Sequence, residues 1–540
     1  MHIQHDQRTT SASSSGRIGR IVSVSGPKLV ILLEPASGVD RHIQVGGLVK
    51  VRQDRSVTFG VLEGMSIPMP REAGDDRELQ IAEVGLIGEL VETAEGAPTF
   101  RRGVSTTPAL NQAVEWADHH DAATVYSLAD RQSITVGHVQ QSPDVPANVA
   151  VDDMLGKHFA ILGTTGTGKS CALTLILKNI ITKNPRAHIL LLDPHGEYGR
   201  AFGDMAEHIT VDNFKLPFWL FNFEEVVEVV FGADRAKMAN EIGHLRELII
   251  SARLSSVKDA KDAPWVNVDT PMPYAFAELM RLVDLAMGKL DANHALPALK
   301  SLRTRLSCLQ AVQRYNFILS LGLTTRDTLR GVLSRLFRIP TNGKPLAVFD
   351  LAGVPSEILN VIVAVVARLA FDLAVSAGQD LPILLICEEA HRYAPQETGS
   401  GFEPAKRGLA RIAKEGRKYG VSLGVLSQRP SDLASSILSQ CNTVFAFRMS
   451  SERDQEIIRA TLSDGSSALF SALPILGNSE AIAVGEGVSV PMRLCMAQLP
   501  AAERPRSSSA AFSMHWQADE TATALDVAVG NWRGRAALTT

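Results

Sequence analysis

The stretch HFAILGTTGTGKSCALTLILKNIITK, residues 158–183, decides the fold of this chain. A short apolar run leads into a glycine-rich bend that fits G-x-x-x-x-G-K-[ST], and a helical pattern follows. The glycines let backbone N–H groups face phosphate oxygens, and the helix adds its positive amino end. We therefore expect ATP here, with Lys169 reaching the β- and γ-phosphates and Ser170 holding Mg²⁺; the strand and helix around the bend disfavour a chance glycine-rich turn. The predicted nucleotide contacts are Gly163, Thr164, Thr165, Gly166, Thr167, Gly168, Lys169, Ser170 and Cys171.

A pair of carboxylates follows a second apolar run, in ILLICEEAHRY at residues 383–393. In open α/β sheets, ligands bind at the carboxyl ends of the strands. Phosphoryl transfer needs one group for the Mg²⁺ shell and another for the attacking water. We assign Glu388 to magnesium and Glu389 to the water; the alternative is two solvated glutamates at a strand end.

Two further polar groups follow strand candidates. LLLDPHGEYG, residues 190–199, places Asp193 and Glu197 at the same sheet edge as possible additional contacts of magnesium or of the attacking water. An Asp-Pro turn with local hydrogen bonds explains them equally well. Gln428, in SQRPSD, is expected beside the γ-phosphate as a sensor, and the alternative is an amide that caps the next helix.

The order of apolar patterns predicts an α/β protein. Short Val- and Ile-rich runs broken by Gly and Pro predict a small β-barrel at 16–148. Strand candidates at 188–193, 346–351, 383–387, 421–427 and 443–449 alternate with helices, which predicts a parallel sheet with helices on both faces. The expected domains are a disordered segment at 1–15, the barrel at 16–148, an α/β core at 149–223 and 341–500, a helical insertion at 224–340, and a tail or packing arm at 501–540.

Composition excludes several classes of protein. The 540 residues are 45% hydrophobic and carry a formal net charge of −4, so a basic coat protein is excluded and any DNA site must be local. The five scattered cysteines form no CxxC pair, which favours a reducing interior over a disulfide framework or zinc site. The first residues lack the apolar core of a secretory signal, and the apolar run Val361–Val375 is interrupted by Arg368 and Asp372. We expect a cytoplasmic protein with no membrane span.

One helical stretch, GLARIAKEGRKYG, carries a row of cations. Arg407, Arg411, Lys414 and Lys418 are spaced to share one helical face. A solvated face is the ordinary explanation of such a row. The alternatives are contact with DNA phosphates or an arginine finger that reaches a neighbour's ATP. The finger candidates are Arg417 and Arg448.

At this point the sequence resembles a family, the HerA-type ATPases. The motifs ILGTTGTGKS, LLLDPHGEYG, LPFWLFNFEE, AVFDLAGVP, LLICEEAHRYAP and EGRKYGVSLGVLSQRPSDL occur in that family's order, and GRIGRIVSVSG looks like its N-terminal HAS-type barrel. The resemblance covers about residues 16–500. It implies a RecA-like P-loop core, a homo-hexameric ring with a central channel, and movement on double-stranded DNA with a nuclease or other effector. It also implies nucleotide and Mg²⁺ roles for Lys169 and Ser170, catalysis by Glu389 and sensing by Gln428. Glu388 departs from the Asp of many members, which bears on the metal geometry.

Two functions follow from this resemblance. The leading one is an ATP-driven double-stranded DNA translocase or helicase in DNA repair or phage defence. The alternative is a ring scaffold that regulates an effector, such as a NurA-like nuclease or a sirtuin-like NADase docked on the barrel end. A third, a protein unfoldase, lacks an aromatic-hydrophobic pore motif.

Overall fold

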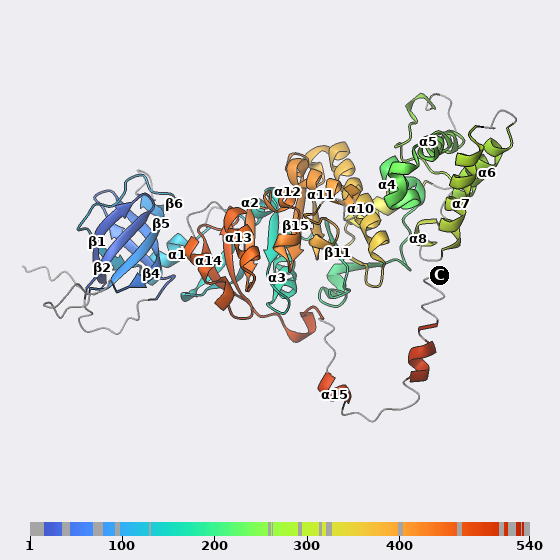
Figure 1. Cartoon of the computed structure of the whole chain (residues 1–540). Coiled ribbons are helices and arrows are strands. Elements are labelled where there is room, and N and C mark those ends of the chain that lie inside the picture. Colours follow the sequence, from blue (N-terminus) through green and yellow to red (C-terminus); the bar gives the residue numbers. More distant parts are fainter. Residues whose placement is uncertain are drawn as a thin grey trace, which may run out of the picture. The chain divides into compact units, whose positions relative to one another are not determined.

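The computed structural model describes residues 16–34, 44–67, 79–91, 98–128, 131–257, 261, 263–289, 294–312, 316–319, 327–397, 403–461, 467–506, 512–516, 525–530 and 532–533. The segment predicted to be disordered, residues 1–15, lies outside them. The chain divides into two compact units. We call Met1–Asp152 with Thr443–Ala497 the barrel unit, and Asp153–Asn442 with Gln498–Thr540 the P-loop unit (Figure 1).

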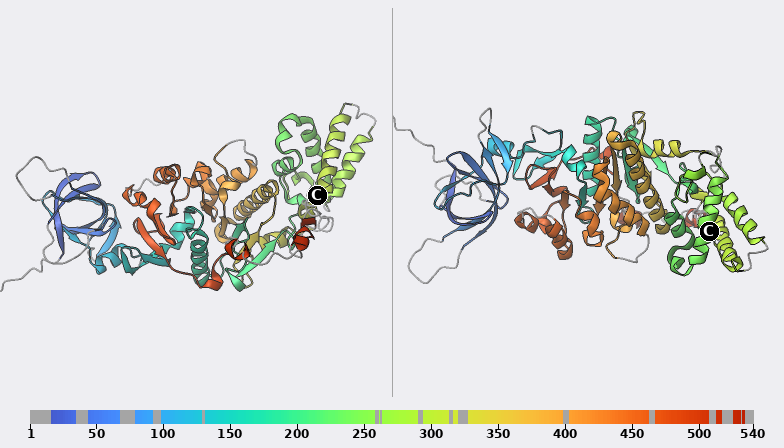
Figure 2. Two further views of the ribbon diagram at one scale, coloured as in Figure 1. Left: turned by 60° about the horizontal axis from the view of Figure 1, so that its bottom comes forward. Right: turned by 90° about the horizontal axis from the view of Figure 1, so that it is seen from above.

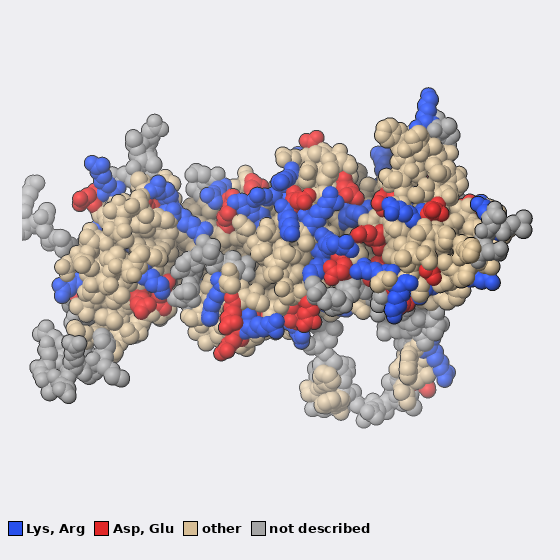
Figure 3. Space-filling model, turned by 45° about the horizontal axis from the view of Figure 1, so that its top comes forward, with Lys and Arg blue, Asp and Glu red and all other residues tan. Residues whose placement is uncertain are grey.

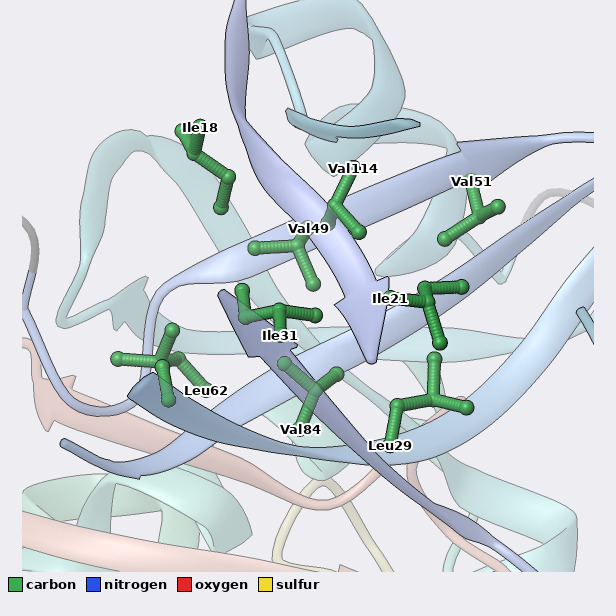
Figure 4. Close-up of a cluster of buried hydrophobic side chains, with 10 residues drawn as sticks. Ile18, Ile21, Leu29, Ile31, Val49, Val51, Leu62, Val84 and Val114 are labelled. Carbon is green, nitrogen blue, oxygen red and sulfur yellow. The ribbon is translucent and has the colours of Figure 1, made fainter. Parts of the chain in front are cut away.

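The barrel unit begins with a closed antiparallel barrel. Its strands are β1 (Arg17–Ser25), β2 (Lys28–Leu33), β3 (Leu48–Arg52), β4 (Ser56–Ser66), β5 (Ile81–Val91) and β7 (Ala113–Trp116), with β6 (Thr99–Arg102) paired to β5. The order is β2-β1-β7-β3-β4-β5, and β2 pairs again with β5, so no barrel edge is left open. Aliphatic side chains fill the interior, among them Ile21, Ile31, Val49, Leu62 and Val84 (Figure 4). The predicted N-terminal barrel is confirmed.

Five further strands belong to the barrel unit. They are β8 (Ser133–Val139), β9 (Ser142–Ala150), β16 (Thr443–Phe447), β17 (Glu480–Gly485) and β18 (Met492–Met496). They run antiparallel in the order β16-β17-β18-β8-β9. The expected domains put residues 133–148 in the barrel and 443–497 in the α/β core. Short Val-rich runs indicate half-buried strands but do not indicate their partners, so these domain bounds stay predictions.

The P-loop unit contains six parallel strands. They are β10 (Phe159–Leu162), β11 (Ile189–Asp193), β12 (Ala206–Thr210), β13 (Leu346–Asp350), β14 (Ile383–Cys387) and β15 (Val421–Ser427), in the order β12-β13-β11-β14-β15-β10. Every neighbouring pair is parallel, so all six carboxyl ends share one edge. This confirms the predicted α/β class. The edge strand β12 was not predicted, because AEHIT lacks a continuous apolar run.

Helices cover this sheet. The helix α3 (Lys169–Lys183) follows β10, and α10 (Ser356–Ala377) packs against α11 (Glu403–Glu415) and against β14 and β15 (Figures 1 and 2). The two helices approach closely at Gly408, where a Cβ would stand 3.4 Å from the Cβ of Ala367, an ordinary van der Waals contact. The segment Ile358–Asp380 is long and apolar enough to cross a membrane, yet 78% of its most apolar window is buried inside the protein. Such burial is expected of a core helix.

The helical insertion opens with α4 (Phe223–Phe231). Its further helices are α5 (Ala239–Leu254), α6 (Phe276–Met287), α7 (Leu296–Ala311), α8 (Asn316–Leu319) and α9 (Leu329–Phe337). Asn222 and Glu225 form a capping box that starts α4. Arg368 of α10 holds the buried Glu225 through Nε and Nη2, at 2.9 and 3.0 Å, and also donates to the Leu220 carbonyl. One buried ion pair thus ties the insertion to the sheet's covering helix.

Candidate active site

The P-loop, residues 163–170, leaves the carboxyl end of β10 and enters α3. Gly163, Gly166 and Gly168 have φ values of 153°, 78° and 111°, a region that favours glycine. A Cβ on Gly166 would meet no atom within 4 Å, so the space beside this glycine is open. Cys171, in the first turn of α3, is half-buried. The bend and the helix end therefore present an open set of backbone donors to an anion.

Lys169 folds back into the P-loop. Its ammonium donates to the carbonyl of Thr164 at 2.9 Å, and Thr167 Oγ1 donates to the same carbonyl at 2.8 Å. Burial lowers the pKa of Lys169, and the charges of Glu389, Glu388 and Glu197 oppose that shift. Three carboxylates are therefore close enough to the lysine to favour its charged form, against the effect of burial.

Asp193 ends β11 and holds its own loop. Its carboxylate accepts backbone N–H groups from His195, Glu197 and Tyr198 at 3.3, 3.2 and 3.0 Å. The side chain is fully buried, and burial raises its pKa despite these bonds. This geometry matches the Asp-Pro turn with local hydrogen bonds, one of the two alternatives for this motif.

Glu197, in the same loop, instead faces the P-loop. Ser170 Oγ donates to its Oε2 at 3.0 Å. Burial raises the pKa of Glu197, this hydrogen bond lowers it, and the charge of Asp193 raises it further. The Ser170 hydroxyl, which is predicted to bind Mg²⁺, is thus in direct contact with the Glu197 carboxylate.

Glu388 follows β14 and is buried. Tyr198 donates its hydroxyl to Glu388 Oε1 at 2.9 Å, while Oε2 has no hydrogen-bond partner among the described residues. Burial raises the pKa of Glu388 well above its usual range, and the charges of Asp193 and Glu197 add to the shift. An uncompensated buried carboxylate oxygen is costly unless a cation or donor satisfies it.

Glu389 adopts a left-handed backbone, with a φ of 50°. Such a conformation is uncommon outside glycine and clusters at functional sites. The side chain is nearly buried, and its Oε2 lies 3.2 Å from His391 Nδ1. The two consecutive carboxylates therefore leave β14 in different directions and meet different partners.

Gln428 lies at the end of β15 and touches the P-loop. Its Oε1 accepts a hydrogen bond from Thr165 Oγ1, and the preceding Ser427 carbonyl accepts the N–H of Gly163 at 3.3 Å. The structure thus brings together the P-loop, Glu197, Glu388, Glu389 and Gln428 at one sheet edge. The roles predicted for these side chains stay predictions.

The arrangement fits ATP and Mg²⁺. The space beside Gly166 of the P-loop is open, and Glu388 Oε2 has no hydrogen-bond partner among the described residues. Within the described ranges, no group of three or more His, Cys, Asp or Glu side chains is arranged to hold a metal ion. Ser170 and Glu388 would therefore supply a minority of the ligands, as is common for Mg²⁺, which keeps phosphate oxygens and waters.

The predicted row of cations lies only partly on one helix. Arg407 and Arg411 are exposed on α11; Arg407 pairs with Glu224 at 3.2 Å, and the Arg411 guanidinium stands 4.1 Å above the Phe371 ring. Lys414 is exposed in the last turn. Lys418 lies beyond the helix, in a 3-10 turn at Gly416–Lys418, which corrects the prediction of a four-residue helical face. The chain turns tightly there, since a Cβ on Gly416 would stand 2.7 Å from the Val421 carbonyl oxygen.

The two finger candidates have different surroundings. Arg417 is exposed in the turn after α11. Arg448 belongs to the barrel unit, where it donates to the Leu476 carbonyl at 3.4 Å and to Asn478 Oδ1 at 3.1 Å. Both remain candidates.

Sequence reasoning did not single out Tyr198, His391 or Ser427. Each lies within two residues of a predicted site residue, at the end of a strand or in the loop after it. Their position at strand ends could have identified them as site residues, because side chains just beyond parallel strands converge on the same edge of the sheet.

Comparison with known proteins finds similarity to helicases. Residues 134–370 match the family model of the HerA helicase central domain. The chain is 27% identical over 411 residues to the DNA double-strand break repair helicase HerA of Pyrococcus furiosus, covering 66% of this chain and 68% of the relative. It is 24% identical over 487 residues to a probable HerA repair helicase of Methanocaldococcus jannaschii, covering 83% and 92%.

A solved structure shows the same fold. VirB4 of Thermoanaerobacter pseudethanolicus superposes with a TM-score of 0.52 at 16% identity, covering 69% of this chain and 98% of that one. The motif order, the matched central domain and the relatives agree: the chain is similar to the HerA helicases, and it is a P-loop ATPase with an N-terminal β-barrel.

Proposed function

We propose that the protein is an ATP-driven motor that moves double-stranded DNA as a homo-hexameric ring. One observation carries the proposal: the P-loop and two buried carboxylates, Glu388 and Glu389, share a sheet edge with Lys169 among them. Buried acidic groups beside an open phosphate loop suit a magnesium nucleotide and little else. The names of the repair-helicase relatives support DNA as the substrate.

The residues divide the work of hydrolysis. The P-loop amides and Lys169 would hold the phosphates, and Ser170 and Glu388 would hold Mg²⁺, which neutralises charge that develops on the β- and γ-oxygens. Glu389 would orient and polarise the attacking water. Gln428, bonded to Thr165 of the P-loop, would report the γ-phosphate to β15.

The DNA contact is proposed for the outer face of α11. Arg407, Arg411 and Lys414 are exposed there, and Figure 3 shows Lys and Arg side chains gathered over this part of the P-loop unit. Exposed cations bind phosphate without reading sequence, which suits a translocase. Arg417 or Arg448 would serve as the finger toward a neighbouring subunit's ATP.

The effector is proposed to be a nuclease or a NAD-consuming enzyme that docks on the barrel, in repair or phage defence within the cytoplasm. Absence of DNA stimulation combined with co-purification of such an effector would favour the scaffold alternative.

The test is ATP turnover by the purified protein with and without linear duplex DNA. We expect stimulation by DNA that falls steeply as salt rises from 50 to 200 mM, because the contacts are to phosphate. Lys169→Ala is the matched inactive control. Equal turnover with and without duplex DNA in a wild-type hexamer would contradict the motor.

A further inference from the structure

His391 occupies the junction between the predicted catalytic carboxylate and the strand end that carries Gln428. It lies in a single 3-10 turn, Ala390–Arg392, directly after Glu389. Its Nδ1 is 3.1 Å from Ser427 Oγ and 3.2 Å from Glu389 Oε2, and only 15% of its side chain is exposed. One ring nitrogen thus faces two oxygens from different elements.

Burial and hydrogen bonds on two sides hold Ser427 in place. It is fully buried, its Oγ accepts the N–H of Arg429 at 3.0 Å, and its carbonyl accepts the N–H of Gly163. Its position is therefore set by the P-loop on one side and by the turn after β15 on the other. A group bonded to Ser427 Oγ is held in register with the phosphate loop.

Glu389 has no comparable anchor. Its Oε2 is buried and accepts no well-aligned hydrogen bond from any described residue. His391 Nδ1 is the polar atom placed to satisfy it after a small rotation of either side chain. A carboxylate has two oxygens, so fixing Oε2 leaves Oε1 for the attacking water.

The proton of His391 belongs on Nδ1. With the proton on Nε2, the Nδ1 lone pair would face a carboxylate oxygen 3.2 Å away, which is repulsive. With the proton on Nδ1, the N–H points between two acceptors, Ser427 Oγ and Glu389 Oε2. The neighbouring negative charge therefore selects the Nδ1–H tautomer.

We propose that His391 is a positioning residue for Glu389. Its Nδ1–H, anchored on Ser427, orients the carboxylate so that its free oxygen faces the attacking water. Because Ser427 precedes Gln428, which touches the P-loop, the same ring keeps the carboxylate aligned with the γ-phosphate sensor. This inference rests on the proposed role of Glu389 in ATP hydrolysis.

The test compares ATP hydrolysis and ATP binding in variants of the full-length protein. His391→Ala removes the donor. His391→Asn places an amide nitrogen where Nδ1 stands, whereas His391→Gln carries the same amide one methylene further, near the position of Nε2. His244→Ala, a half-buried histidine of the insertion, is the matched control. The readouts are kcat at saturating ATP with duplex DNA, and Kd for a fluorescent non-hydrolysable ATP analogue.

We expect kcat of His391→Ala to fall roughly 10-fold or more with Kd within about twofold of wild type, as for lost outer-shell partners at other sites. His391→Asn should recover most of the rate, and His391→Gln should recover little. The proposal is overturned if His391→Ala keeps the wild-type rate, if it loses ATP affinity in proportion to rate, or if Gln rescues as well as Asn. Should the alanine variant fail to fold, the Asn and Gln variants decide the question by themselves. Wild-type protein that hydrolyses no ATP would refute the proposed function, which is a different result.

Discussion

The ion pair between Arg368 and Glu225 offers a direct test of how the insertion is attached. We consider Arg368→Ala. Arg368 is 17% exposed at its side chain and Glu225 is 3% exposed, and the arginine makes two bonds to the carboxylate and one of 2.6 Å to the Leu220 carbonyl. Removal of the arginine leaves the buried Glu225 carboxylate without its partner, which lowers the free energy of unfolding by about 3–5 kcal/mol. At roughly 2 °C per kcal/mol for a unit of this size, Tm should fall by about 6–10 °C.

The matched control is Arg281→Ala. Arg281 also donates two hydrogen bonds of 2.8 Å to a glutamate, Glu278, but this pair lies on an exposed helix surface. Water replaces an exposed pair at little cost, so Tm should stay at its wild-type value. Both variants are measured by thermal unfolding followed by circular dichroism.

The loss in Arg368→Ala should also depend on pH. Burial raises the pKa of Glu225, and the partner charge of Arg368 opposes that shift. Without the arginine, Glu225 can take up a proton as pH falls from 8 to 5, and neutralisation removes the buried charge. The destabilisation should therefore shrink at low pH. A Tm loss no larger than that of Arg281→Ala, or one equal at pH 8 and pH 5, would refute the reasoning.

Four further predictions concern the nucleotide site and the proposed DNA contact. Lys169→Ala should abolish ATP turnover, and Glu389→Gln should bind ATP without hydrolysing it; normal turnover by the glutamine variant in a phosphate-release assay would exclude Glu389 as the base. Burial raises the pKa of Glu388 in the folded protein above the value of about 4.3 that a glutamate has in the unfolded chain. Its contribution to stability is therefore complete at a pH below the unfolded pKa, and it is lost as the pH rises through the folded pKa. In nucleotide-free protein, Glu388→Gln should therefore gain Tm relative to wild type as pH rises from 5 to 8, and a constant difference would count against the buried carboxyl. Lys414→Ala should weaken duplex binding at every sequence and reduce the slope of log affinity against log salt by about 1, measured by fluorescence anisotropy; an unchanged slope would remove Lys414 from the DNA contact.

The strands of the P-loop unit were predictable because their signal is local. Continuous apolar runs such as ILLIC mark strands that are buried on both faces, and the structure places that strand at Ile383–Cys387. The edge strand Ala206–Thr210 and the strands Glu480–Gly485 and Met492–Met496 were not predicted. Their alternating patterns are weaker, and their partners are distant in sequence.

The candidate site was predictable in its parts and not in its contacts. The sequence indicated Asp193 and Glu197 as equivalent additional carboxylates. The structure distinguishes them, because three N–H groups of the loop point at Asp193 while Ser170 points at Glu197. The direction of a side chain in a tight loop depends on backbone geometry that composition and spacing do not carry.

The sequence by itself determined that this chain is a P-loop ATPase with a β-barrel before it, because a glycine-rich bend between a strand and a helix has one well-known use and needs no distant residue to be recognised. Only the tertiary structure decided which side chains share the site. Tyr198 meets Glu388 across 190 positions of sequence, and Thr165 meets Gln428 across 263. Such meetings follow from the strand order β11-β14-β15-β10, which long-range packing sets and no local pattern encodes.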